Sequence, residues 1–435
     1  MVRISQCMIA KNEEGNIETA LSSLKDVVFE QIVVDTGSSD CTAVIAEELG
    51  AKVYSFDWCG DFSAAKNYAI DKAAGEWILF GDADEYFMPE DAQKIQDFIA
   101  QIEANPETKR RTLAISLACV NIDDRGNPMT KASIVRIFRN IPDVHYKGRI
   151  HEELNIKSGS IAHAADIKFM HTGYSEAVSK EKGKAERNIE LLRIELADAP
   201  DNLNLKAYLA DSLSSTDDEK NRDEAARLFD EVINSKDGPQ VNSVLRVKAF
   251  TYYIKKYLEP PADPKKSEEI CRKALHAYPG TLDFGFYLAK VLSMQGKHEQ
   301  AWEQLKIFEK ILLSESESAG GSADFGPDAA AVSDASIMIT ADPITFFCQM
   351  IITAQGLGDI ENVVLYSLHV LSIDSSRMSV LGPCIANLVH YGVSNSEIAE
   401  LLSNVYDFND KGDVNTVAEA AKNVGAKTFA DWIKG

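Results

Sequence analysis

The chain of 435 residues lacks the features that would suit it to a membrane, a disulfide-stabilised fold or nucleic acid. It has no apolar run near the roughly 20 residues that a membrane-spanning helix needs. Its seven cysteines form no CxxC pair and no zinc-ligand spacing, so we expect buried thiols in a reducing compartment. Basic residues are scarce, 45 against 67 acidic ones, for a net charge of -22. This balance argues against a nucleic-acid partner, because phosphate backbones are bound by basic surfaces.

A signal segment is also missing from the sequence as it stands. The chain passes directly into an apolar segment, Val2–Ile9, without the charged and apolar regions of a secretory leader. We therefore expect a cytoplasmic protein without a transmembrane segment.

From residue 1 to about residue 175, short apolar segments alternate with amphipathic helices. Strands are expected at Val2–Ile9, Gln31–Asp35, Lys52–Phe56 and Trp77–Phe80. This alternation predicts a Rossmann-like α/β domain, with a parallel sheet covered on both faces. Ligands of such sheets bind beyond the carboxyl ends of the strands. That rule selects the loops at residues 11–16, 35–40 and 81–85.

The rest of the chain follows a helical pattern, which we divide into residues 176–313 and residues 341–435. A prolyl residue is followed nine and ten positions later by Leu and Ala in two places: Pro200 with Leu209 and Ala210, and Pro279 with Leu288 and Ala289. Such spacing is typical of tetratricopeptide-like repeats, in which helix pairs stack on one another. A non-repeating helical bundle is the alternative. The Gly-rich, polar segment 314–340 is expected to be a flexible loop or an insertion.

The strongest chemical signal is the pair Asp82 and Asp84, directly after the expected strand Trp77–Phe80. Two carboxylates so close repel one another and need a cation or hydrogen-bond donors to stay ionised. Mn²⁺ or Mg²⁺ bridging to a nucleotide diphosphate would supply that cation. Acidic pairs also occur as mere loop decoration, but the position after a strand favours a ligand site.

Four segments occur in an order that resembles family 2 glycosyltransferases of the GT-A fold: Ile9–Glu14, Val34–Ser38, Ser63–Asn67 and Gly75–Glu85. The resemblance covers about the first 90 residues. It implies an inverting transfer from a nucleotide sugar, usually a UDP-sugar, with a divalent metal.

The same resemblance implies roles for individual residues. Asp35 would meet the base, Asp82 the ribose or the metal, and Asp84 the metal. Lys66 would lie near the nucleotide, where it replaces an arginine and loses the planar bidentate geometry. Asn12, Glu13 and Ser38 complete the expected nucleotide-sugar contacts.

Two further segments, Lys147–Glu153 and His171–Tyr174, resemble a narrower group. It includes lipopolysaccharide-core glucosyltransferases and the peptide S-glycosyltransferases of glycocin pathways, which also carry helical repeats. Inverting transfer needs a base that takes the acceptor proton. Glu152 is the first candidate for that base, followed by Glu153 and His151. His171 is expected to be a third metal ligand or a diphosphate contact, or else a buried, hydrogen-bonded histidine.

The sequence therefore predicts transfer of a hexose from a UDP-sugar to a peptide or protein held by the helical repeats. Two alternatives stay open at this point. One is a glycosyltransferase for a surface glycan or lipid-linked saccharide, with a homodimer formed through the helical region. The other is a non-catalytic repeat scaffold that binds nucleotide sugar.

Overall fold

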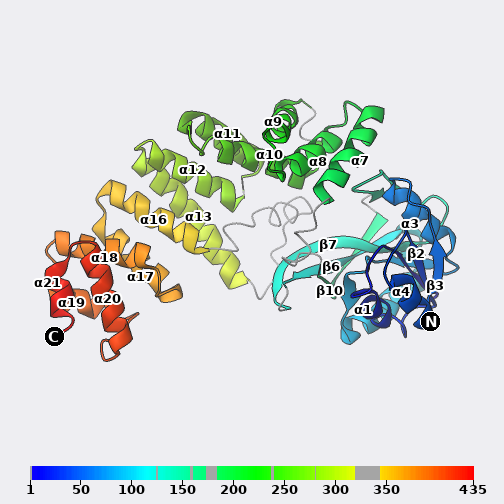
Figure 1. The fold of residues 1–435 in the computed structure, drawn as a ribbon, viewed down its shortest axis with the longest axis horizontal. Coiled ribbons are helices and arrows are strands. Elements are labelled where there is room, and N and C mark those ends of the chain that lie inside the picture. Colours follow the sequence, from blue (N-terminus) through cyan, green and yellow to red (C-terminus); the bar gives the residue numbers. More distant parts are fainter. Residues whose placement is uncertain are drawn as a thin grey trace. The chain divides into compact units, whose positions relative to one another are not determined.

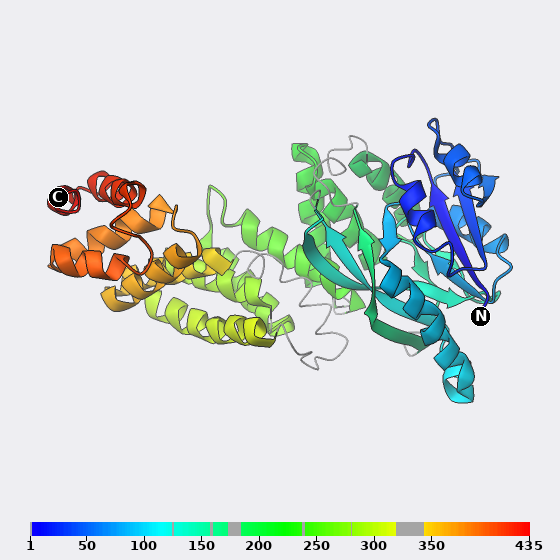
Figure 2. The same ribbon diagram turned by 90° about the horizontal axis from the view of Figure 1, so that it is seen from below.

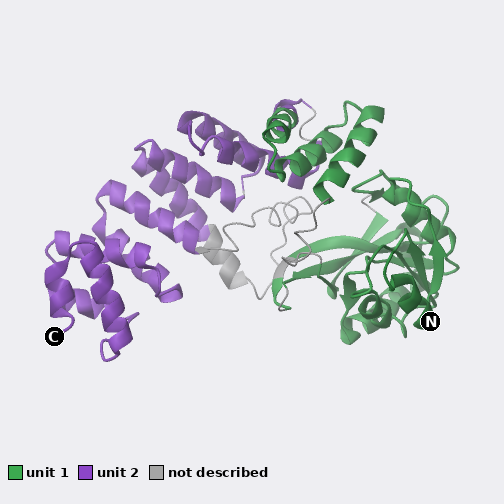
Figure 3. Ribbon diagram, in the orientation of Figure 1, with its two compact units in different colours: residues 1–228 green, residues 229–435 purple. Residues whose placement is uncertain are grey.

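The computed structural model describes residues 2–123, 126–156, 160–172, 184–236, 240–279, 281–318 and 343–435. The chain divides into two compact units, residues 1–228 and residues 229–435 (Figure 3). Gly173 and Tyr174, which belong to the second predicted motif pair, lie outside the described residues, as do residues 319–340 of the predicted loop.

The first unit contains an α/β domain followed by helices. Its strands are β1 (Ile4–Ala10), β2 (Glu30–Asp35), β3 (Lys52–Ser55), β4 (Trp77–Phe80), β5 (Glu85–Phe87), β6 (Ala114–Ile122), β7 (Pro128–Arg139), β8 (Tyr146–Lys147), β9 (Glu153–Leu154) and β10 (Ile161–His171). Its helices are α1 (Ile17–Ser22), α2 (Thr42–Glu48), α3 (Phe62–Asp71), α4 (Pro89–Ala104), α5 (Pro106–Arg111), α7 (Lys184–Asp198) and α8 (Leu203–Ser214), and α9 (Glu219–Asn234) spans the division between the units.

Eight of the strands form one sheet in the order β3-β2-β1-β4-β7-β6-β10-β5 (Figure 1). β1 pairs in parallel with β2 and β4, and β2 pairs in parallel with β3. The predicted parallel sheet is therefore right for the first four strands. The remainder of the sheet is mixed: β10 runs parallel to β6, but β7 runs antiparallel to both β4 and β6, and β5 runs antiparallel to β10, so an all-parallel sheet is wrong there. Of the added strands, β6 to β10 follow one another without a described helix between them, so the strand–helix alternation did not reveal them.

Helices cover both faces of the sheet, as the sequence predicts. α4 presents Ile95, Ile99 and Ile102 to one face, a spacing of four and three residues that places all three on one side of the helix. The ribbon of α4 runs beside the sheet in Figure 2. α1 and α2 pack on the same face of β1 and β2. α3 covers the opposite face with Ala69 and Ile70. This packing fixes the position of α3. Other residues of α3 line a cleft at the ends of the strands.

The second unit is helical throughout its described residues. Its helices are α10 (Ser243–Lys256), α11 (Pro264–Ala277), α12 (Leu282–Met294), α13 (His298–Ser318), α16 (Pro343–Leu357), α17 (Ile360–Ile373), α18 (Met378–His390), α19 (Asn395–Leu402), α20 (Lys411–Asn423) and α21 (Lys427–Trp432). The fold class predicted from the sequence, an α/β domain followed by an all-α region, is confirmed.

The residues of the predicted repeat are buried where successive helices meet. Leu288 and Ala289 of α12 and Ala301 of α13 are all at most 2% exposed. α12 and α13 approach so closely at Gly285 that a Cβ atom there would overlap the ring of Phe308. A helix–helix contact of this kind requires glycine, since protein interiors leave no room for the added carbon.

Two expectations need correction. α13 continues to Ser318, so the first five residues of the predicted loop 314–340 are helical; the first glycine of that segment, Gly320, comes only after them, and no proline precedes it. The cysteines are all free, but Cys41 and Cys59 are exposed rather than buried. In the part of the chain that the structure describes, every helix is too short or too polar to cross a bilayer.

Candidate active site

A cleft of about 790 Å³ opens beyond the carboxyl ends of β1, β2 and β4. It is the position that the strand-end rule predicts for a ligand. Its charged and polar lining residues are Lys11, Asn12, Glu13, Thr36, Lys66, Asp82, Asp84, His151, Glu152, His171, Lys184, Arg187 and Asn188. Loops of the sheet, helix α3 and helix α7 thus all contribute to one cavity.

Asp82 lies between two cationic side chains. Its Oδ1 is 3.9 Å from Lys66 Nζ, and its Oδ2 accepts a hydrogen bond of 3.1 Å from Arg136 Nη2. Burial would raise the pKa of Asp82, but Lys66 and Arg136 outweigh it and lower the pKa. Arg136 also pairs with buried Glu85, whose pKa is raised by burial. The cation that the sequence argument required for Asp82 is therefore supplied by the protein.

Lys66 joins Asp82 to the predicted base. It is only 6% exposed, and its Nζ is 2.5 Å from Glu152 Oε1. Burial would lower the pKa of Lys66, but the charge of Asp82 reverses that effect and raises it. The rings of Phe80 and Tyr146 lie 5.2 Å and 5.1 Å from the ammonium group. Lys66 is thus held as a cation between two carboxylates.

Asp84 is paired with His171 across the cleft. His171 Nε2 lies 3.3 Å from Asp84 Oδ2, and Nδ1 is 2.7 Å from Asn121 Oδ1. Burial would lower the pKa of His171, but the hydrogen bond to Asp84 raises it to about 10. A carboxamide or carboxylate on the second ring nitrogen is the usual support of a metal-binding histidine. Asp84 and His171 would bind a divalent cation with the imidazole in its neutral form: Nδ1 would donate to Asn121, and the metal would take the place of the proton between Nε2 and Asp84.

The three predicted metal ligands are not assembled as a set. Among the described residues, no group of three or more His, Cys, Asp and Glu side chains is arranged to hold a metal ion. Asp82 is engaged by Lys66 and Arg136, whereas Asp84 and His171 stand together. Any cation here would need further ligands from a substrate or from water.

The loop before Glu152 is fixed at several points. Ser63 Oγ donates to Gly148 O at 2.5 Å, and Phe62 N donates to Arg149 O at 2.8 Å, both from the start of α3. His151 has a φ of 52°, in the left-handed region that non-glycine residues rarely adopt. Glu152 follows this turn and lines the cleft.

The other two candidates for the base lie differently. His151 lines the cleft, but its ring stacks on Tyr208 of α8. Glu153 is exposed in β9 and is absent from the cleft lining. The geometry thus favours Glu152 among the three.

The predicted nucleotide contacts form a network between the loops after β1 and β2. Ser38 Oγ accepts from Asn12 N at 3.0 Å, and Asn12 Oδ1 accepts from Ser39 N at 2.8 Å. Asp35 accepts from the backbone and hydroxyl of Ser38. Asn12 and Glu13 line the cleft, whereas Asp35 and Ser38 are not among its lining residues and hydrogen-bond within the loop.

Some residues that line the cleft, or that hold its lining residues, were not predicted from the sequence. Arg136 in β7 and Asn121 in β6 reach the site through strands that the sequence analysis did not include. Lys184, Arg187 and Asn188 belong to α7, the first helix of the region predicted to be separate repeats. An arginine inside the apolar stretch Ile134–Phe138 was the one local signal, since a charge in a strand core needs a partner.

Residues 5–106 match the family model described as Glycosyl transferase family 2. The chain is 33% identical over 222 residues to a TPR repeat-containing protein of Synechococcus elongatus, covering 49% of this chain and 52% of that protein. It is 31% identical over 199 residues to the SPbeta prophage-derived glycosyltransferase SunS of Bacillus subtilis, covering 43% of this chain and 44% of that protein. The resemblance predicted from the sequence, a family 2 glycosyltransferase domain with tetratricopeptide-like helices, is confirmed.

These matches cover parts of the proteins concerned. The chain spans about half the length of the two relatives, 52% and 44%. Among solved structures, S. aureus TarS 1-349 in complex with UDP-GlcNAc is 18% identical, covers 64% of this chain and 90% of that one, and has a TM-score of 0.32.

Proposed function

We propose, from the premise that residues 5–106 form a glycosyl transferase family 2 domain, that this chain is an inverting glycosyltransferase. It moves a hexose from a UDP-sugar to a peptide or protein acceptor. The observation that carries the proposal is the meeting of Asp82, Asp84 and Glu152 in one cleft at the strand ends.

The nucleoside end of the donor is assigned to the loops after β1 and β2. Asn12 and Glu13 line that part of the cleft and offer amide and carboxylate groups to the uridine. Asp35 accepts from Ser38 and still has lone pairs for a nucleobase N–H, because a carboxylate has about four acceptor sites.

Asp84 and His171 would hold the divalent cation, Mn²⁺ or Mg²⁺, which supplies positive charge against the departing diphosphate. The charge of Asp82 is offset by Lys66 and Arg136. We assign Asp82 to the ribose of the donor and to holding the Lys66 side chain in place.

Glu152 is the proposed base. The nucleophilic atom of the acceptor forms a bond to the anomeric carbon while the bond from that carbon to the diphosphate oxygen breaks. The acceptor proton passes to the Glu152 carboxylate, and UDP leaves. The ion pair with Lys66 holds the Glu152 side chain at the wall of the cleft, where an acceptor would have to lie within hydrogen-bond reach of it.

The acceptor assignment draws on the helical region. Stacked helix pairs such as α11–α12 and α16–α17 offer extended surfaces that suit a peptide better than a free sugar. The similarity to SunS, itself named a glycosyltransferase, is consistent with this class. Hexose transfer to peptides that carry Cys, Ser or Thr is therefore expected over transfer to saccharides.

The experiment combines binding with turnover on the full chain. Calorimetry should detect UDP binding in Mn²⁺ that Asp84→Ala abolishes and that Asp201→Ala, at an exposed carboxylate outside the cleft, retains. UDP release from UDP-hexoses should then depend on an added peptide acceptor. If the wild type does not bind UDP, the donor is not a UDP-sugar. If the protein is active on saccharides alone, the acceptor is not a peptide.

The base is tested by adjacent substitutions. Glu152→Gln should lower turnover by about 10²–10⁴ while UDP still binds. Glu153→Gln should leave turnover near the wild-type value, because that side chain is exposed outside the cleft. The reverse result would move the base to Glu153.

A further inference from the structure

Helix α7 brings two cationic side chains to the cleft. Lys184 and Arg187 both line it, and they are three residues apart, on one side of the helix. Neither side chain has a carboxylate within ion-pair distance among the described residues. Lys66, by contrast, is already paired with Glu152 and lies close to Asp82. The α7 cations are therefore available to a ligand.

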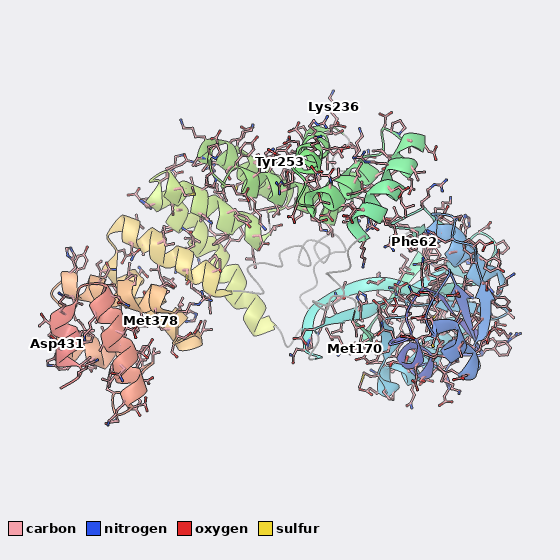
Figure 4. The ribbon with its side chains drawn as sticks, in the orientation of Figure 1. Phe62, Met170, Lys236, Tyr253, Met378 and Asp431 are labelled. Atoms are coloured by element: carbon pink, nitrogen blue, oxygen red, sulfur yellow. The ribbon has the colours of Figure 1, made fainter. Side chains whose placement is uncertain are left out.

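The position of Arg187 follows from its contact with α3. Its guanidinium lies 5.3 Å from the centre of the Phe62 ring, a cation–π arrangement. Phe62 is four residues before Lys66 on the same helix, so the two side chains project from one face about one turn apart. Figure 4 labels Phe62 on the side of the domain that faces α7. Arg187 thus stands beside the part of the cleft that holds Lys66 and Asp82.

The middle and the last turn of α7 are also anchored to the α/β domain. Glu195, two turns beyond Arg187, accepts a hydrogen bond of 2.9 Å from Arg149 N, in the loop that leads to Glu152. Leu191, one turn beyond Arg187, is buried against Gly60, where an added Cβ would be 3.3 Å from the leucine. These contacts fix the helix that carries both cations.

The negative charge of a nucleoside diphosphate exceeds what one divalent metal ion offsets, so further cations such as those of α7 are needed. A nucleoside diphosphate carries about three negative charges near neutral pH, because the last phosphate pKa is about 6. One divalent cation offsets two of them. Within the cleft Lys66 is a single cation that faces two carboxylates, Glu152 and Asp82, so it has no positive charge to spare for the ligand. The remaining negative charge needs a partner that α7 can supply.

We propose that Arg187, assisted by Lys184, binds the diphosphate of the donor and of the UDP product, so that the first helix after the α/β domain is part of the donor site. The inference rests on the proposed function and adds to it a group that the family 2 segment, residues 5–106, does not contain. A guanidinium suits this task, since its planar donors match two phosphate oxygens at once.

The test compares ligands that differ in phosphate content. Calorimetry on the full chain, at fixed Mn²⁺, measures uridine, UMP and UDP with the wild type, Arg187→Gln and Lys184→Gln. Arg193→Gln is the matched control, because Arg193 belongs to the same helix but pairs with Glu224 and is absent from the cleft lining.

Arg187→Gln should weaken UDP binding about tenfold or more, as expected for a lost charge-assisted hydrogen bond, and should leave uridine binding unchanged. Lys184→Gln should have a smaller effect in the same direction, and Arg193→Gln none. Equal weakening of UDP and uridine would overturn the assignment, as would undiminished UDP binding. A wild type that binds neither ligand would overturn the proposed donor, and this assignment with it.

Discussion

The imidazole ring of His151 lies flat on the phenol ring of Tyr208, with ring centroids 3.8 Å apart and an angle of 9° between the planes. His151 has a left-handed backbone, and it directly precedes the proposed base, Glu152. A non-glycine residue in this region costs about 1 kcal/mol or more, so packing around it has to compensate. The stack on Tyr208 is one such contact, and it comes from helix α8.

Tyr208→Ala should therefore slow the transfer without weakening the binding of the donor. We expect kcat to fall about tenfold, because a small displacement of a base is enough for such a loss, while KM for the UDP-sugar stays the same. Tyr208→Phe keeps the ring and should behave as wild type. Steady-state kinetics of the three proteins provide the measurement; an unchanged kcat for Tyr208→Ala would show that the stack does not position Glu152.

Lys66 should matter for stability as well as for binding. Lys66→Met leaves the carboxylates of Glu152 and Asp82 without their shared cation, and should lower the free energy of unfolding by about 3 kcal/mol. Adding Glu152→Gln removes one of those charges, so the double variant should recover part of the loss. Urea unfolding of the single and double variants measures this coupling. Strict additivity of the two changes would contradict the ion-pair interpretation.

The second unit contains a carboxylate whose ionisation should make stability depend on pH. Glu268 of α11 accepts hydrogen bonds from Lys297 Nζ at 2.8 Å, Arg272 Nη2 at 2.8 Å and Gln295 Nε2 at 2.9 Å. The bond from Lys297 is the largest cause that lowers the pKa of Glu268, from its ordinary 4.5 to about 2. Because the folded pKa is the lower one, this stabilisation is complete above pH 4.5 and is lost as the pH falls toward 2.

Glu268→Gln should accordingly destabilise the protein at neutral pH by about 1 kcal/mol, a value that allows for screening by solvent. The difference from wild type should shrink at about pH 3, between the two pKa values. Urea midpoints at the two pH values measure it. Glu269→Gln, at an exposed neighbour paired with Lys266, serves as control and should show little change at either pH. A Glu268→Gln difference that is constant with pH would exclude the carboxylate as its origin.

Gly285→Ala should overpack the contact between α12 and α13. The added Cβ would overlap the buried ring of Phe308, and relieving such an overlap costs about 1–3 kcal/mol. Phe308→Leu removes the ring edge, so Gly285→Ala should cost less in that background. Thermal unfolding of the wild type, the two single variants and the double variant measures the coupling between the two positions. If Gly285→Ala lowers the stability equally with Phe308 and with Leu at that position, the strain does not come from the ring.

Much of the donor side could be predicted because its signals are local. Asp82 and Asp84 follow an apolar strand, and the loop with Asn12 follows another, so a rule about strand ends was enough to bring them together. The tetratricopeptide-like spacing was likewise readable, since Leu288 and Ala289 repeat the offsets of an earlier pair.

The partners of those carboxylates could not be predicted in the same way. Arg136 lies 54 residues from Asp82, and Asn121 lies 50 residues from His171. The first pair depends on the register of β7 against β4, and the second on the register of β10 against β6, in which His171 is the partner of Asn121. Register is a long-range property set by the packing of whole strands, so single residues carry little sign of it.

The anchoring of α7 and α8 has a consequence for recombination within such proteins. A chimera with its junction at residue 175 would exchange Arg187, Glu195 and Tyr208 for foreign residues, although the family 2 segment remained intact. A junction after α8, beyond Ser214, would carry the complete wall of the cleft with the domain. An exchange of the helical region should therefore begin at α9 and leave α7 and α8 with the α/β domain.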